Sequence, residues 1–389
     1  MRVNWKNLVR LFASMQLTVV LLILSLLLVF VATLDQVNLG IWAVQEKYFR
    51  SLFVLWRGHD GGPAIPIFPG GYLIGGLLFL NLIAAHVTRF QLSWKKSGIF
   101  LTHFGLIILL VGELLSGLWQ EDYQMRLDEG QTSNFSESPL LNELALINTT
   151  DPKADDVLAI PEKLLARGQP LQHPMIPFRV VIKTYFPNAQ LQMRGQLTNP
   201  PPALATNGMG AEIAVSSQPV TYRPNEANTP AASIELIGTN GTLGTWLVST
   251  QLGNPQTFTH EGKTWQLLLR AERYYKPFSL TLLKFSHDRY AGTEIPKNFS
   301  SRVRLQTADG TTDREVKIYM NNPLRFAGLT FYQAGFQNND RTTILQVVRN
   351  PSWRLPYIAC GLMSLGLLVQ FGLSLTTFIR KRTAAAKPV

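Results

Sequence analysis

Four stretches of this chain are long and apolar enough to cross a lipid bilayer, and they constrain the fold more than any other feature. They are residues 17–34, 71–88, 98–118 and 356–379. The first and last contain no charged residue, the second contains His86, and the third contains His103 and Glu113. Because roughly 20 apolar residues cross a hydrocarbon core of about 30 Å, we expect four transmembrane helices. The first apolar run is longer than the roughly 7–15 residues of a signal-peptide core, which favours a retained anchor.

The basic residues predict how these helices are oriented. Ten of them lie in three short segments that lack acidic residues, namely Arg2, Lys6 and Arg10; Arg89, Lys95 and Lys96; and Arg380, Lys381, Arg382 and Lys387. By the positive-inside rule these segments face the cytoplasm. The net charge of +11 is therefore a topology signal, and it does not indicate a nucleic-acid surface.

These signals predict a multi-pass protein of the cytoplasmic (inner) membrane with one large domain on the extracytoplasmic, periplasmic side. The expected segments are a cytoplasmic N-terminus (1–14), transmembrane helix 1 (15–34), an outer loop (35–70), transmembrane helix 2 (71–88), a cytoplasmic loop (89–97), transmembrane helix 3 (98–118), an extracytoplasmic domain (119–355), transmembrane helix 4 (356–379) and a cytoplasmic tail (380–389).

The large domain is expected to be mostly β, as a sandwich or a barrel. Short alternating or β-branched runs such as 178–183 and 264–269 are separated by turn signals such as Asn240-Gly241, a pattern typical of strands and hairpins. Residues 196–230 are rich in Pro, Asn and Ala and predict a long loop or insertion. Tyr274, Tyr275 and Lys276 are expected on the surface of an edge strand.

The outer loop carries apolar residues at helical spacing, namely Ile41, Val44, Tyr48, Leu52, Leu55 and Trp56. This spacing predicts an amphipathic helix. Two positions for it remain open, on the membrane surface or packed beneath the outer domain.

Cysteine usage excludes one chemistry. The only cysteine is Cys360, inside the fourth apolar stretch. The chain therefore cannot perform dithiol exchange by itself, and any thiol step belongs to a partner. The sequence also lacks a Gly-x-Ser-x-Gly elbow, a His-Glu-x-x-His motif, a P-loop and a dinucleotide fingerprint.

His103 and His86 are the candidate site residues. An ionisable residue inside a transmembrane helix is costly and suggests a functional site, and neutral imidazole is a good iron ligand. At 1.5 Å per residue, His103 lies roughly 10 Å beyond Lys96, and His86 lies three residues before Arg89, so the two histidines can face each other. Alternatively, His103 bonds only to a neighbouring helix, and His86 is an ordinary interfacial residue.

Three glycines repeat every seven residues in the third apolar stretch, at Gly98, Gly105 and Gly112. Small residues at this spacing favour close helix packing. If the packing partner were a helix of another protein, a second histidine could lie opposite His103.

Several motifs resemble those of the ResB (CcsB) family of cytochrome c biogenesis proteins, which belong to the System II pathway. They are Ser14–Leu17, Ala32–Gln36, Leu80–Leu82, Leu101–Gly112, Asp288–Ser301, Asn321–Ala334 and Arg349–Pro351. The Asn321–Gln333 part is expected to be a structural hairpin. Residues 150–260 carry no recognisable motif of the family.

The resemblance implies a cytochrome c maturation factor that works with a CcsA-type membrane protein. Together they would bind haem b as a transported substrate, move it across the membrane and attach it to apocytochrome c. The chain would be one subunit of a cytochrome c synthase (haem lyase) complex and not catalytic alone, so no catalytic residue is predicted. His103 matches the family's transmembrane haem-iron ligand. The partners implied are the CcsA-type protein, apocytochrome c, an extracytoplasmic thiol reductase and the lipid bilayer, with no nucleic acid.

A second class of function remains open, a cofactor-free, membrane-anchored binding or scaffolding subunit of an envelope assembly. Bound haem in the purified protein distinguishes the two. A transporter is disfavoured because four spans without repeats or broken helices make a poor translocation path.

Overall fold

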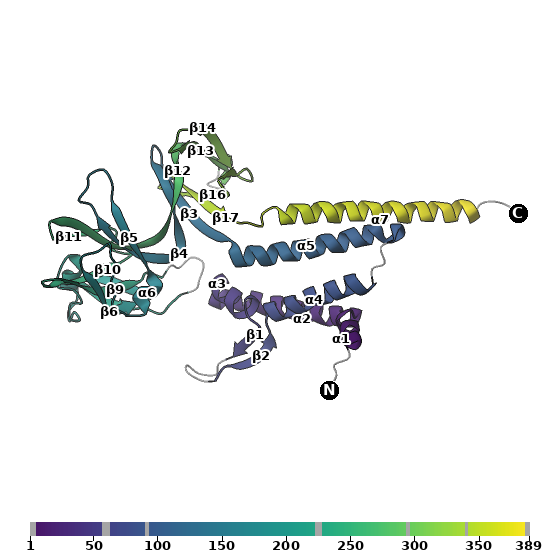
Figure 1. The fold of residues 1–389 in the computed structure, drawn as a ribbon, viewed down its shortest axis with the longest axis horizontal. Helices are drawn as coiled ribbons and strands as arrows, with labels where there is room; N and C mark the ends of the chain where they lie inside the picture. Colours follow the sequence, from purple (N-terminus) through teal and green to yellow (C-terminus); the bar gives the residue numbers. More distant parts are fainter. Residues whose placement is uncertain are drawn as a thin grey trace. The chain divides into compact units, whose positions relative to one another are not determined.

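The computed structural model describes residues 5–56, 63–89, 93–221, 228–292, 296–338 and 341–385. The chain divides into two compact units. A helical unit is built from residues 1–120 and 350–389, and a β-rich unit from residues 121–221 and 225–349. The predicted fold class, four apolar helices and a large mostly-β domain, is confirmed (Figure 1).

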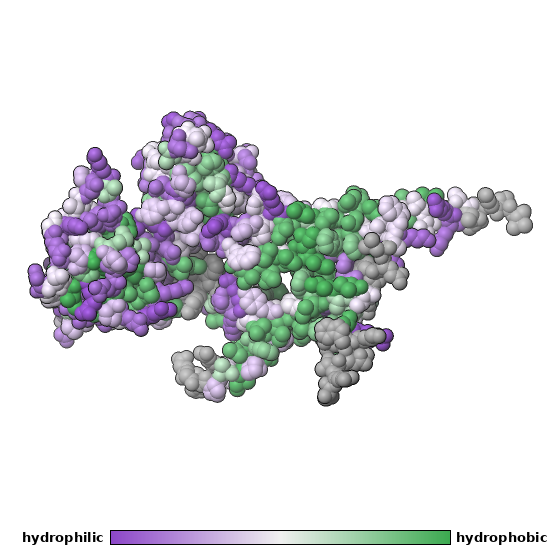
Figure 2. Space-filling view, in the orientation of Figure 1, coloured by the Kyte–Doolittle hydropathy of each residue, from purple (hydrophilic) through white to green (hydrophobic). Residues whose placement is uncertain are grey.

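Four helices among the described residues are long and apolar enough to cross a membrane. They are α2 (Met15–Leu39), α4 (Gly71–Arg89), α5 (Ser97–Trp119) and α7 (Leu355–Ala385). Two shorter segments adjoin them, α1 (Trp5–Phe12) and the 3-10 turn η2 (Trp94–Lys96). Within the helical unit α5 lies beside α7, and α2 beside α4 (Figure 1). Hydrophobic residues gather over these helices, whereas the surface of the β-rich unit is mainly hydrophilic (Figure 2).

The glycine stripe of α5 packs against α7 of the same chain. A β-carbon at Gly98 would lie 2.6 Å from the backbone nitrogen of Gln370, and one at Gly105 would lie 2.9 Å from the carbonyl oxygen of Ala359. Glycine is required at both positions because the two backbones approach so closely. The stripe is therefore not available to a partner's helix, which corrects the sequence-based suggestion that such a helix would pack on it.

Helices α2 and α4 are joined by a buried amide. Asn81 on α4 is 3% exposed. Its Oδ1 accepts a hydrogen bond of 2.6 Å from the Thr18 hydroxyl, and its Nδ2 donates to the carbonyl oxygens of Phe12 and Ser14. These bonds satisfy backbone groups where α1 ends and α2 begins, which explains a polar residue within an apolar stretch.

The outer loop is helical only in its first part, in α3 (Ile41–Val44) and the π-helical turn η1 (Gln45–Phe49). Leu55 and Trp56 were predicted to continue a helix, but they lie in strand β1 (Phe53–Trp56), paired with β2 (Ile65–Pro69). Aromatic and β-branched residues favour this pairing over a helix. The helical part is tied to α2, because Lys47 Nζ and the Tyr48 hydroxyl donate to Asp35 Oδ2 at 2.8 and 2.9 Å.

The described strands of the β-rich unit form one ten-stranded sheet, one three-stranded sheet and one two-stranded sheet. The ten-stranded sheet has the order β14-β13-β12-β4-β3-β17-β16-β15, with β11 paired to β12 and β5 to β4. Its strands are β3 (Glu121–Asp128), β4 (Thr132–Asn148), β5 (Asp156–Pro161), β11 (Gln256–His260), β12 (Lys263–Arg289), β13 (Pro296–Thr307), β14 (Asp313–Tyr319), β15 (Leu324–Phe326), β16 (Leu329–Gln337) and β17 (Thr342–Arg349). The three-stranded sheet is β10 (Gly241–Ser249), β9 (Ala231–Gly238) and β6 (Arg179–Phe186).

The large sheet contributes residues to two hydrophobic cores. One core joins Leu144 and Leu267 of the large sheet to Ile234 of the three-stranded sheet. The other surrounds Leu280 and Phe331. The strand β12 is 27 residues long and contributes to both cores.

The remaining elements include the short helix α6 (Glu162–Ala166) and two 3-10 turns, η3 (Arg194–Gln196) and η4 (Met209–Glu212). The region 196–230, predicted as a loop, contains strand β8 (Ile213–Ser217), which pairs with β7 (Ala189–Met193). The Asn321–Gln333 motif forms the predicted hairpin, whose two-residue turn has positive φ at Ala327 and Gly328, as a type I′ turn requires.

Candidate functional site

His103 lies in the second turn of α5, where a local hydrogen bond determines which ring nitrogen carries the proton. His103 Nδ1 lies 2.9 Å from the carbonyl oxygen of Ile99, one turn earlier. A carbonyl oxygen can only accept, so Nδ1 donates its proton and Nε2 carries the lone pair of the neutral ring. Metal-binding histidines commonly donate their other N–H in this way, which fixes the ring and raises its basicity.

His86 lies in the last turns of α4, against an aromatic pair on α5. Its ring centroid is 4.6 Å from that of Phe100 and 6.5 Å from that of Phe104. Phe100 and Phe104 are one helical turn apart, with ring centroids at 6.1 Å. These contacts hold the His86 ring on the face of α4 that meets α5.

The structure places the two predicted residues on neighbouring helices, since His86 of α4 contacts Phe100 and Phe104, which lie on either side of His103 in the sequence of α5. Both lie near the helix ends that flank the 89–97 segment. Their surroundings are aromatic and apolar, and a porphyrin already supplies four nitrogen ligands to its iron, so a haem needs only one or two axial ligands from protein. The donor set and its neighbours therefore fit a haem iron.

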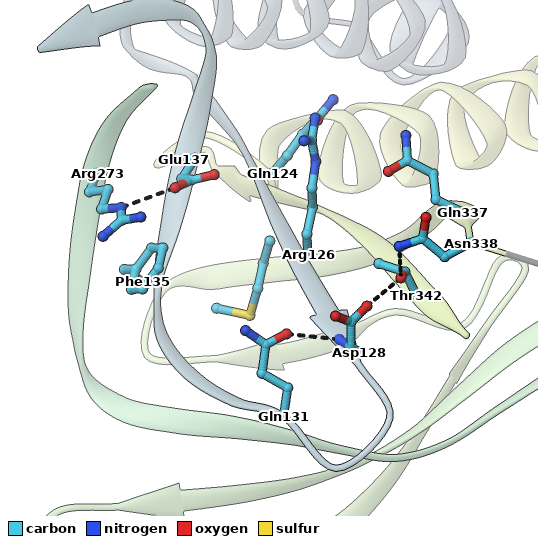
Figure 3. A pocket seen from close by; sticks show the side chains of 11 residues that line it. Gln124, Arg126, Asp128, Gln131, Phe135, Glu137, Arg273, Gln337, Asn338 and Thr342 are labelled. Atoms are coloured by element: carbon cyan, nitrogen blue, oxygen red, sulfur yellow. Dashed lines mark hydrogen bonds and ion pairs between the residues drawn. The ribbon is translucent and has the colours of Figure 1, made fainter. Parts of the chain in front are cut away.

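A polar pocket of about 370 Å³ in the β-rich unit was not anticipated (Figure 3). Its lining residues are Gln124, Met125, Arg126, Asp128, Gln131, Phe135, Glu137, Arg273, Gln337, Asn338 and Thr342. One sequence signal was present, because Gln124, Arg126 and Asp128 alternate along β3 and such residues share one face of a strand.

Lys276 is buried, contrary to the expectation of an edge-strand surface. It is 5% exposed, because β12 lies between β4 and β13 inside the sheet. Its Nζ donates to the Ser136 hydroxyl at 2.6 Å and to the Tyr274 carbonyl oxygen at 3.1 Å. Burial lowers the pKa of Lys276 to about 8, since removing an ammonium from water disfavours its charged form.

The chain is similar to known proteins in two comparisons. The model of the ResB-like family matches residues 241–344, which run from β10 into β17 and include the Asp288–Ser301 and Asn321–Ala334 motifs. The chain is also similar to Protein NrfI of Wolinella succinogenes, at 24% identity over 295 residues. The aligned region is 75% of this chain and 29% of NrfI, so the chain spans well under half of that relative.

Proposed function

Because the chain belongs to the ResB-like family of cytochrome c biogenesis proteins, we propose that it holds haem in the membrane for transfer to apocytochrome c. A CcsA-type membrane protein would be its partner in this step. The haem is cargo, bound in transit and passed on.

His103 is the residue that would bind the iron, through Nε2. The observation that carries this role is the 2.9 Å hydrogen bond from Nδ1 to the Ile99 carbonyl oxygen, because it holds the ring in one tautomer with the lone pair on Nε2. The second axial ligand would come either from His86, which contacts Phe100 beside it, or from the partner.

The orientation follows from the basic segments. With residues 89–97 in the cytoplasm, His86 and His103 lie toward the cytoplasmic leaflet, where haem would enter. The β-rich unit is then extracytoplasmic, on the side of apocytochrome c. A separate thiol reductase would keep the apocytochrome cysteines reduced, because this chain has one cysteine, Cys360.

The test is the visible absorption spectrum of the detergent-purified protein, alone and with its CcsA-type partner. We expect a six-coordinate, low-spin haem spectrum in the complex. His103→Gly should lower the haem content or give a high-spin spectrum, and added imidazole should restore the low-spin spectrum by occupying the vacated position. His86→Gly should have a similar effect only if His86 is the second ligand.

The matched control is His173→Gly, which removes an exposed histidine of the β-rich unit. An unchanged haem content and spectrum in His103→Gly would show that His103 only packs against its neighbours. Complete absence of haem from the wild-type complex would favour the alternative, a cofactor-free scaffold.

A further inference from the structure

The polar pocket of the β-rich unit lies where two neighbouring strands separate. Strand β3 pairs along its whole length with β17, but it pairs with β4 only at Gln124 and Glu137. From that point to the turn at residues 129–131 the two strands diverge. The pocket of about 370 Å³ opens between them (Figure 3), and this volume falls in the range of roughly 300–1,000 Å³ that is usual for ligand sites.

Side-chain amides line much of this pocket, at Gln124, Gln131, Gln337 and Asn338. Gln131 Oε1 accepts a 2.9 Å hydrogen bond from the Asp128 backbone N–H, and Asn338 Nδ2 donates to Thr342 Oγ1 at 2.9 Å. Among the described residues these bonds leave the Gln131 side-chain NH₂ group and the Asn338 side-chain oxygen Oδ1 without a hydrogen-bond partner. An amide offers both a donor and an acceptor, which is the complement of a peptide group.

Two of the four charged residues that line the pocket form an ion pair with each other. Glu137 binds Arg273 at 3.0 Å, and the Arg273 guanidinium lies 4.1 Å from the centre of the Phe135 ring. Asp128 accepts a hydrogen bond from the Thr342 hydroxyl. Arg126 has no carboxylate within ion-pair distance among the residues that the structure describes. Its guanidinium is therefore the group that a negatively charged ligand would meet.

We propose that this pocket binds an extended peptide segment that carries an acidic side chain. The carboxylate pairs with Arg126, whose planar guanidinium can form two parallel hydrogen bonds, and the peptide groups bind the surrounding side-chain amides, each of which offers a donor and an acceptor. That the peptide is a segment of apocytochrome c rests on the function proposed above, whereas the binding chemistry does not.

The first test is fluorescence anisotropy of labelled hexapeptides with the full-length protein in detergent. One peptide contains a central glutamate, and its counterparts contain glutamine or lysine at that position. We expect the glutamate peptide to bind best. Arg126→Gln should weaken its binding about tenfold, consistent with the loss of a charge-assisted contact, and Arg126→Glu should reverse the preference in favour of the lysine peptide.

The matched control is Arg314→Gln, which removes the same charge from an exposed position on β14 and should leave binding unchanged. Thermal unfolding of each variant verifies that it is folded. Equal binding of the three peptides, or equal affinity in wild type and Arg126→Gln, would overturn the proposal.

The second test separates this site from the proposed function. When each variant is supplied to a strain that lacks the chain, Arg126→Gln should give weaker haem staining of c-type cytochromes than wild type, whereas Arg314→Gln should give wild-type staining. If deletion of the chain abolishes staining but Arg126→Gln retains all of it, the maturation role stands and the pocket is not the substrate site. If deletion itself leaves staining intact, the maturation role fails, and the anisotropy result still decides whether the pocket binds peptides.

Discussion

Single residues show how the surroundings of an ionisable side chain determine its chemistry. His103 has a carbonyl partner one turn away, at Ile99, which fixes its tautomer without removing its lone pair. Lys276 is bound by a hydroxyl and a carbonyl oxygen, neither of which carries a charge. The hydrogen bond of His103 fixes its tautomer, whereas burial lowers the pKa of Lys276.

The depressed pKa of Lys276 gives the β-rich unit a pH-dependent stability. The unfolded lysine has its ordinary pKa of 10.5 and the folded one a pKa of about 8, so between these values the unfolded state binds more protons. Stability therefore rises with pH in this window, by at most about 3 kcal/mol at 1.36 kcal/mol per pKa unit. At pH 7 the lysine is charged in both states, so the full free-energy cost of burying its ammonium group lowers the stability.

The measurement is thermal unfolding of the purified protein from pH 7 to pH 10.5. Wild type should gain stability relative to Lys276→Met as pH rises through 8, because only wild type has this proton to release. Lys263→Met, at an exposed lysine of the same strand, should follow the wild-type curve. Parallel curves for wild type and Lys276→Met would show that Lys276 does not titrate in this range.

These two residues also mark what the sequence can predict. His103 was selected as a candidate because a histidine within an uninterrupted apolar stretch stands out locally, and its role as a ligand stays a prediction. Lys276 was misjudged as surface because its burial depends on strand order. Its neighbours come from β4, about 140 residues earlier (Ser136), and no local pattern encodes that pairing. The pocket around Arg126 was missed for the same reason, since its lining comes from the five strands β3, β4, β12, β16 and β17 and from adjoining turn residues.

Helices and strands differ in how far their partners can be inferred. The four apolar helices follow from composition alone. The seven-residue glycine repeat correctly indicated close packing of α5, but it could not indicate that α7 is the neighbour. In the outer loop the type of element itself was predicted wrongly, because Leu55 and Trp56 fit a helical period and nevertheless lie in a strand that pairs with β2.

The α5–α7 contact predicts opposite outcomes for two glycines of one helix. A β-carbon at Gly105 would lie 2.9 Å from the Ala359 carbonyl oxygen, whereas one at Gly117 would have no heavy atom within 4 Å. Gly105→Ala should therefore destabilise the protein by about 1–3 kcal/mol through overpacking, and Gly117→Ala should be neutral or stabilising because alanine is the better helix former. Thermal unfolding in detergent measures both. Equal midpoints for the two variants would contradict this packing.

At the scale of the whole molecule, the charge distribution predicts which side of the membrane each part occupies. The expectation is that both termini and residues 89–97 are cytoplasmic and that the β-rich unit is outside. Alkaline phosphatase, active only when exported, should be active when fused after Gly130, in the turn that follows β3. Green fluorescent protein fused at the same position should be dark, and the same reporters after Lys96 should give the reverse pattern. Fluorescence at Gly130 would overturn the orientation.

The proposed role in haem delivery predicts a selective defect in cells. Covalent attachment of haem to apocytochrome c needs every subunit of the maturation complex, whereas b-type haem binds its proteins without a covalent bond. Deleting the gene should therefore abolish haem staining of denatured c-type cytochromes and leave the b-type spectrum of the membranes unchanged. Wild-type protein supplied from a plasmid should restore staining, and the His103→Gly protein should restore it only weakly, more fully when imidazole is added to the medium. Normal c-type staining in the deletion strain, with no second copy of the gene present, would reject the role. Loss of b-type haem as well as c-type haem would instead indicate a defect in haem synthesis.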